Sequence, residues 1–152
     1  MPSLRIVCRS VVYDIRDNTI LLVRNHGQDW WYMPGGEWNY AEEDICECVK
    51  REVFEETGIH VNIVKFGYVQ NIFIKEKNSI WLELFWLAVP VDKKQILITH
   101  IDEFGLVAEA KWFNKTEILQ IKIYPEIIKQ IFWKDVESIL NETDRYIGFF
   151  SI

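Results

Sequence analysis

Three acidic residues stand close together in the first half of the chain: Glu52, Glu55 and Glu56. In a helix that turns by about 100° per residue, Glu55 lies about 60° to one side of Glu52 and Glu56 about 40° to the other. The three carboxylates then project from one face. Carboxylate oxygens are the ligands that Mg²⁺ prefers, and a bound Mg²⁺ can polarise a phosphoryl group and activate a water molecule.

The pattern around these acids predicts a helix over residues 42–57, with Gly58 as its C-terminal cap. The acidic face continues an apolar stripe that we expect to face the core, formed by Ile45, Cys48 and Val49. Ionised carboxylates on a partly buried face repel one another and are costly to desolvate unless a cation compensates them. The alternative is a solvated acidic face paired with Lys50 and Arg51, and the surrounding sequence argues against it.

The residues around this helix resemble the Nudix box, G-x5-E-x7-R-E-U-x-E-E-x-G-U, in which U is aliphatic. Residues 51–59 (REVFEETGI) match its second half at every specified position, and seven residues separate Glu43 from Arg51 as the pattern asks. One spacing differs, because six residues stand between Gly36 and Glu43 where the pattern has five. Either the loop holds an inserted residue and Glu43 is the box glutamate, or Glu42 takes that role.

The resemblance implies a MutT-like Nudix hydrolase with an α+β fold, a mixed β-sheet sandwiched between helices (α/β/α). It implies hydrolysis of a nucleoside diphosphate linked to another moiety, such as a nucleoside triphosphate or a nucleotide sugar, with Mg²⁺ or Mn²⁺ as cofactor. Glu52, Glu55 and Glu56 become metal-binding and base candidates, Arg51 would orient them, and the Gly36 carbonyl would add a ligand. A Nudix module that binds nucleotides with little catalysis is the alternative, and the intact set of glutamates favours the enzyme.

Many Nudix proteins use a further acid from outside the box, and three residues are candidates here: Glu83, Glu103 and Glu109. Glu103 falls in an expected loop at residues 100–105, and Glu109 lies three residues before Trp112 on a predicted strand. Glu83 alternates with aromatic residues on one face of another predicted strand. For each of them, a surface acid is the competing interpretation.

Residues beside the glycine loop are the candidates for substrate contacts. Arg24 and His26 are candidates for touching phosphate, with loop solvation as the alternative. Trp30, Trp31 and Trp38 flank the loop and are candidates for stacking on a nucleobase. Packing in the core is the alternative for each tryptophan, because aromatic side chains are large core residues.

The whole chain, residues 1–152, reads as a single domain, because its length and its 49% hydrophobic residues suit one packed core. The remaining apolar patterns predict strands over residues 4–13, 19–23, 61–74, 80–89, 96–99 and 108–113. The first two are expected to form a hairpin. A C-terminal helix is expected over about residues 125–140, followed by an apolar tail from residue 146 that docks on the body.

The net charge limits the kinds of binding partner that we expect, and the cysteine count limits the roles of the thiols. A net charge of −6 argues against a protein that tracks nucleic-acid backbones or anionic membranes, and leaves a nucleotide-type small molecule as the expected partner. Cys8, Cys46 and Cys48 are too few for a disulfide framework, and we expect core-filling thiols rather than a metal or redox pair. With no signal peptide or long apolar run, the expectation is a soluble cytoplasmic protein, monomeric or homodimeric.

Overall fold

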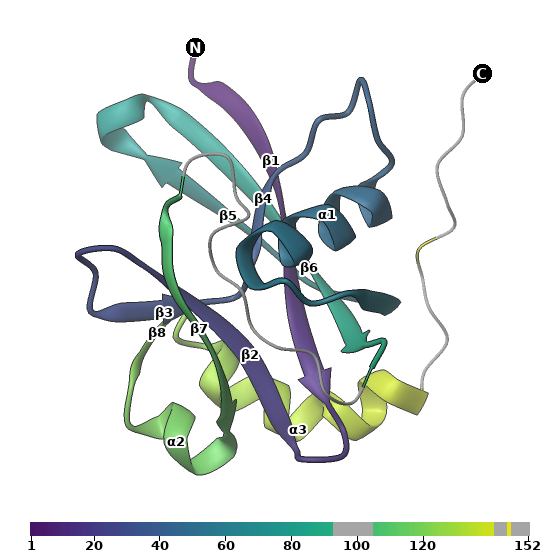
Figure 1. The fold of residues 1–152 in the computed structure, drawn as a ribbon. Coiled ribbons are helices and arrows are strands. Elements are labelled where there is room, and N and C mark those ends of the chain that lie inside the picture. The colour runs from purple at the N-terminus through teal and green to yellow at the C-terminus, as the bar shows by residue number, and fades with distance from the viewer. Residues whose placement is uncertain (93–104, 142–145, 147–152) are drawn as a thin grey trace.

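The computed structural model describes residues 1–92, 105–141 and 146 of the chain. In this part, eight strands form one curled, mixed sheet with helices on both of its faces (Figure 1). The strand order is β5-β6-β1-β2-β3-β8, with β4 paired to β1 and β7 paired to β2. The predicted α+β fold, a mixed sheet between helices, is therefore confirmed.

The strands are β1 (Ser3–Asp14), β2 (Thr19–Asn25), β3 (Trp30–Tyr32), β4 (Gly35–Glu37), β5 (Val61–Ile74), β6 (Ser79–Pro90), β7 (Val107–Asn114) and β8 (Lys122–Tyr124). The helices are α1 (Ile45–Thr57), the 3-10 turn η1 (Lys75–Lys77), α2 (Lys115–Leu119) and α3 (Ile128–Asn141). The five longer strands follow their predicted positions, whereas the three-residue strands β3, β4 and β8 were not predicted. The strand expected at residues 96–99 lies outside the described residues.

Strand β1 is the centre of the sheet. It pairs in parallel with β6 along almost its whole length, from Ser3 opposite Ser79 to Val12 opposite Ala88. On its other side it pairs antiparallel with β2, which confirms the predicted hairpin. Strands β5 and β6 form a second, longer antiparallel hairpin through η1.

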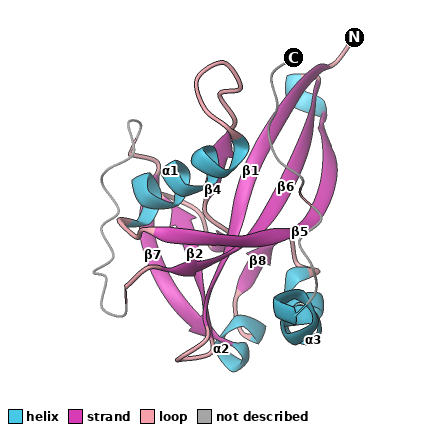
Figure 2. Ribbon diagram, turned by 90° about the vertical axis from the view of Figure 1, so that its right-hand side faces the viewer, coloured by secondary structure: helices cyan, strands magenta, loops and turns pink. Residues whose placement is uncertain are grey.

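Alternate side chains of β1 enter two different cores. Val11 and Tyr13 point to the core that α3 covers, whereas Cys8 and Val12 point to the core that α1 covers. Figure 2 shows the two helices on opposite sides of the sheet. The sheet is therefore buried on both faces around β1, which explains why consecutive residues of this strand are apolar at positions 6–8 and 11–13.

Helix α1 begins three residues later than its predicted start. Asp44 has extended backbone angles and forms a capping box with Glu47, in which each side chain accepts a hydrogen bond of 2.9 Å from the other residue's backbone N–H. Residue 42 therefore belongs to the preceding loop. The predicted C-terminal cap is confirmed, because Gly58 adopts a left-handed conformation (φ 73°) and its N–H bonds to the Phe54 carbonyl.

The three cysteines are free thiols. Cys8 on β1 and Cys48 on α1 are fully buried in the same core, and Cys46 packs at its edge. A hydrogen bond with Cys8, together with burial, raises the pKa of the Cys48 thiol far above its ordinary value. These positions fit the expected core-filling role.

Strand β4 lies very close to β1, and Gly35 makes this approach possible. A Cβ atom at Gly35 would overlap the Cys8 carbonyl oxygen and would lie 2.7 Å from the Arg9 Cα atom. The pairing brings Gly36 opposite Cys8. The glycine pair is thereby held beside the last turns of α1.

Helix α3 confirms the predicted C-terminal helix, with its apolar stripe on the sheet. Ile128, Phe132 and Val136 are buried, and the Phe132 ring contacts Tyr13 of β1 edge-on at 5.5 Å between centroids. The helix begins at Ile128 rather than near residue 125, and Ile127, just before it, is 53% exposed. Tyr146 packs edge-on against Trp86 of β6, on the sheet face that carries α1, and the rest of the apolar tail lies outside the described residues.

We predict that Phe132→Ala lowers the free energy of unfolding by about 3–5 kcal/mol, because the truncation leaves a cavity between α3 and the sheet. The control is Lys134→Ala on the exposed side of the same helix, for which we expect a change within about 0.5 kcal/mol. Urea unfolding followed by circular dichroism measures both. Equal stability of the two variants would show that α3 does not pack as described.

Candidate active site

The three glutamates lie on the last two turns of α1, on the side that faces the sheet. Glu56 is 8% exposed, and the side chains of Glu52 and Glu55 are 14% and 33% exposed. The apolar residues that share their arc, Cys48 and Val49, are buried in the core. The predicted arrangement is confirmed: the acids continue the buried face of the helix.

Strand β4 supplies backbone groups to these carboxylates. The Gly35 N–H donates a hydrogen bond of 2.9 Å to Oε2 of Glu56. A Cβ atom at Gly36 would overlap the Glu52 carboxylate. The second glycine is therefore required because the carboxylate rests directly against the backbone at this position.

Arg51 connects three acidic side chains, Glu43, Glu52 and Glu55, through one guanidinium group. Two of its nitrogens donate to the two carboxylate oxygens of Glu43, at 2.7 and 2.8 Å. Nη1 donates to Glu52 at 2.6 Å and to Glu55 at 3.2 Å. Arg51 therefore contacts three of the four carboxylates directly, and Glu56, the fourth, is held by Gly35. The hydrogen bond to Glu43 is also the main cause of the raised pKa of Arg51.

The contacts of Arg51 decide which residue is the box glutamate. Glu43 forms the bidentate pair and its side chain is 12% exposed, whereas Glu42 is exposed. The hydrogen bond from Arg51 lowers the pKa of the Glu43 carboxyl. The extra loop residue is accommodated before the helix, where the Asn39 carbonyl accepts from the backbone N–H groups of both Glu42 and Glu43.

The site carries more negative than positive charge. Burial raises the pKa of the Glu52 carboxyl, and the hydrogen bond from Arg51 opposes this shift. One guanidinium faces four carboxylates, so a divalent cation with oxygen ligands fits the remaining charge. As the side chains stand, no three His, Cys, Asp or Glu side chains in the described ranges converge on one metal position. The reason is that Arg51 draws Glu52 and Glu55 toward itself while Glu56 bonds to Gly35.

These residues border a cleft of about 840 Å³, large enough for a nucleotide-sized ligand. It is lined by Arg5, Tyr32, Gly35, Gly36, Glu37, Asn39, Glu42, Glu43, Arg51, Glu52, Glu55, Glu56 and Leu106. Sequence reasoning missed Arg5, Tyr32 and Leu106. Arg5 lies on β1, and the pairing of β1 with β4 brings it to the box. No local sequence pattern indicates that pairing.

The acids from outside the box do not line this cleft among the described residues. Glu83 is fully buried on β6, where Arg9 donates to it at 2.8 Å and the Gln70 amide donates at 2.5 Å. Glu109 on β7 accepts a hydrogen bond of 2.7 Å from Arg24. Glu103 lies outside the described residues. Glu83 and Glu109 are thus each paired with an arginine rather than placed at the box.

The expected substrate-contacting residues Trp31 and Arg24 are also away from the cleft lining. Trp31 is buried in the core, with its ring edge-on to Phe113 at 4.8 Å between centroids. Arg24 lies over the Trp31 ring, and Trp38 donates its indole N–H to the Glu43 carbonyl. Trp31 is thus placed for packing rather than stacking, because its side chain belongs to the core between the sheet and α3.

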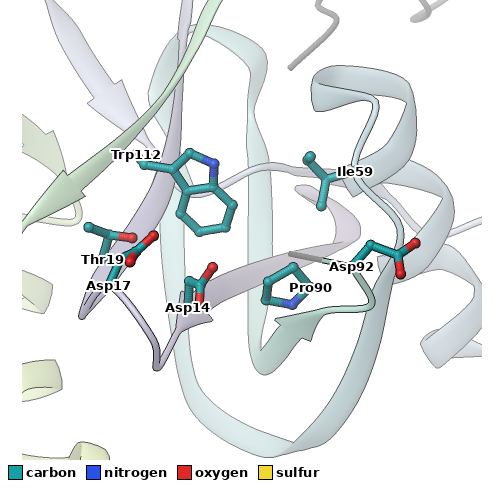
Figure 3. A pocket seen from close by; sticks show the side chains of 7 residues that line it. All are labelled: Asp14, Asp17, Thr19, Ile59, Pro90, Asp92 and Trp112. Carbon is teal, nitrogen blue, oxygen red and sulfur yellow. The ribbon is translucent and has the colours of Figure 1, made fainter. Parts of the chain in front are cut away.

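A second pocket, of about 260 Å³, is lined by acids at the opposite end of β1 (Figure 3). Asp14, Asp17 and Asp92 line it together with Trp112. Asp14 is paired with Arg16, whose side-chain nitrogens donate to both of its carboxylate oxygens at 2.5 and 2.7 Å. This pocket shares no lining residue with the cleft at the box.

Comparison with known proteins supports what the geometry indicates. Residues 5–134 match the model of the NUDIX domain family. No helix in the described part of the chain is long and apolar enough to cross a membrane.

Similar solved structures share the fold. A MutT NUDIX hydrolase from Burkholderia pseudomallei is 21% identical, with a TM-score of 0.66 over 84% of this chain and 95% of that chain. The E. coli ORF135 protein is 19% identical, with a TM-score of 0.69 over 93% of this chain and 96% of the other.

A bifunctional NMN adenylyltransferase/ADP ribose pyrophosphatase from Francisella tularensis, in complex with AMP and a Mn ion, is 19% identical. Its TM-score is 0.70, and the match spans 91% of this chain but 43% of that longer protein. Nudix hydrolases use divalent metals and act on nucleotide-type small molecules. The match over residues 5–134 spans the glycine strand, the helix and the carboxylates around Arg51, so this chain belongs to the NUDIX domain family and is a hydrolase that acts on a pyrophosphate bond.

Proposed function

We propose that this chain hydrolyses a pyrophosphate bond in a nucleoside diphosphate linked to another moiety, and that Mg²⁺ is its metal. The observation that carries the proposal is the group of carboxylates around Arg51, which lies in the cleft beside the glycine strand. A nucleoside triphosphate and a nucleotide sugar are the two substrate classes that we propose to test. Mn²⁺ is the expected substitute for Mg²⁺.

Glu52, Glu55 and Glu56 would hold the metal, with the Gly36 carbonyl as a further ligand. All of these groups offer oxygen atoms, and the three carboxylates supply the negative charge that a hard divalent cation requires. The Glu52 carboxylate rests against the backbone at Gly36, which supports the choice of these two residues as neighbouring ligands. When bound, the metal would neutralise phosphate charge and lower the pKa of a water molecule.

The other protein groups position and tune the carboxylates. Glu43 fixes the guanidinium of Arg51 by two hydrogen bonds, and Arg51 in turn orients Glu52 and Glu55. We therefore propose Glu52 and Glu55 as the candidates for accepting the proton of the attacking water.

A substrate panel tests the activity directly. We expect at least one nucleoside triphosphate or nucleotide sugar to be hydrolysed with Mg²⁺, and activity to disappear when EDTA removes the metal. Phosphate and pyrophosphate release, with chromatography of the nucleotide product, identify the bond that is cleaved. Binding of a nucleotide without hydrolysis of any compound would instead favour the nucleotide-binding module.

We predict that Glu56→Gln lowers turnover by about 100-fold or more with little change in folding, because the amide keeps the shape of the side chain but not its charge. Steady-state kinetics at saturating Mg²⁺ measure the loss. The matched control is Glu47→Gln, an exposed acid on the same helix whose replacement can still cap it. Unchanged turnover of Glu56→Gln would remove Glu56 from the metal site.

We also predict that Gly36→Ala lowers kcat about 10- to 100-fold, because the new methyl group displaces the Glu52 carboxylate. Gly27→Ala is the control: its φ of 75° makes an alanine strained, but no atom lies within 4 Å of the added Cβ. Kinetics and melting temperature are measured for both variants. The control should lose stability without losing kcat, and equal kcat values for the two variants would contradict the proposed contact.

A further inference from the structure

A small basic pocket lies where β1 begins beside the start of β6, and the proposed metal site does not include it. It has a volume of about 340 Å³ and is lined by Ser3, Arg5, Lys77, Ser79 and Trp81. The parallel register places Ser3 opposite Ser79 and Arg5 opposite Trp81. Residues opposite each other on neighbouring strands project from the same face of a sheet, so Arg5 and Trp81 share one surface.

Two cations gather on one aromatic ring in this pocket. Nζ of Lys77 lies 5.3 Å from the centroid of the Trp81 ring, and Cζ of Arg5 lies 6.0 Å from it. Cations are attracted to the face of an indole ring, but two of them near one ring repel each other. An anion between them would relieve that repulsion.

The charges around these cations are only partly compensated. Arg5 has a partner in Glu37 at 3.4 Å, and both side chains are about half exposed (46% and 53%). Lys77 has no carboxylate partner within the part of the chain that the structure describes. In a chain with a net charge of −6, the lining of this pocket presents two cationic side chains and no carboxylate among the described residues.

Arg5 lines both this pocket and the cleft at the box, so the two lie side by side. The cleft lining holds two cations, Arg5 and Arg51. Arg51 is bound to Glu43, Glu52 and Glu55, whereas Arg5 makes a longer, half-exposed pair with Glu37, so Arg5 is the cation that a ligand can recruit more easily. A polyanionic ligand that extends out of the cleft past Arg5 would meet Lys77 next.

We propose that Arg5, Lys77 and Trp81 form a subsite for a phosphate group of the substrate that lies away from the bond that is cleaved. This inference rests on the proposed function and narrows its substrate class. It favours compounds with a longer polyphosphate chain, or with a phosphate on the linked moiety, over compounds that end in an uncharged group. Lys77 and Arg5 bind the phosphate, and Trp81 keeps their cationic ends in place.

The test measures binding of inorganic tripolyphosphate by isothermal titration calorimetry in EDTA, so that neither metal nor hydrolysis contributes. We expect Lys77→Gln and Arg5→Gln each to weaken binding about three- to ten-fold. The matched control is Lys75→Gln, which removes the same charge from the same exposed turn but outside the pocket. Its affinity should stay within about two-fold of the parent protein.

The results of this binding test can be told apart from the results of the substrate panel. No tripolyphosphate binding, or equal weakening by Lys75→Gln and Lys77→Gln, would overturn the subsite whether or not the panel shows hydrolysis. Specific weakening by Lys77→Gln would support it even if hydrolysis fails. For a substrate that carries the additional phosphate, Lys77→Gln should raise KM and leave kcat unchanged, because the phosphate that it contacts does not react.

Discussion

The charge balance around Arg51 is the constraint on which the rest of the site depends. Four carboxylates lie close together, partly buried, and a single guanidinium contacts three of them. Carboxylates in such a place would otherwise repel one another and favour protonation, and burial already shifts the pKa of Glu52 in that direction. Arg51 keeps the site folded and charged, and leaves enough negative charge to attract a divalent cation.

Two elements of the fold, α1 and β4, hold the groups that make up this charge balance. The capping box at Asp44 and the left-handed Gly58 fix both ends of α1, so the position of each carboxylate along the helix is set. On the other side, β4 lies against β1 at Gly35, so the glycine backbone cannot withdraw from the carboxylates.

Features that depend on local periodicity could be predicted from the sequence. The arc shared by Glu52, Glu55 and Glu56 follows from 3.6 residues per turn, and the glycine after the helix is a local signal. The capping box is also a local signal, because Asp44 and Glu47 have the residue types and the spacing of that motif. It places the start of the helix at residue 45 rather than 42. The positions of the longer strands followed from their apolar and β-branched runs.

Features that depend on distant pairing could not be predicted in this way. Trp31 stands next to the glycine loop in sequence, but in the fold its side chain packs against Phe113 of the distant strand β7, in the core that α3 covers. Glu83 alternates with aromatic residues, yet nothing local shows that Arg9, 74 residues away, is its partner. Arg5 reached the cleft only because two β1 pairings, with β4 and β6, meet at the N-terminal strand.

The parallel pairing of β1 with β6 also has a consequence for how the chain folds. Ser3 and Ser79 are 76 residues apart, so the first strand synthesised cannot complete its longest pairing until β6 has left the ribosome. Pairings of such long range close late and slowly, because the loop entropy is lost before the contacts form. Until then one edge of the apolar strand β1 is exposed, and this interval is when the nascent protein is most open to aggregation or to binding by chaperones.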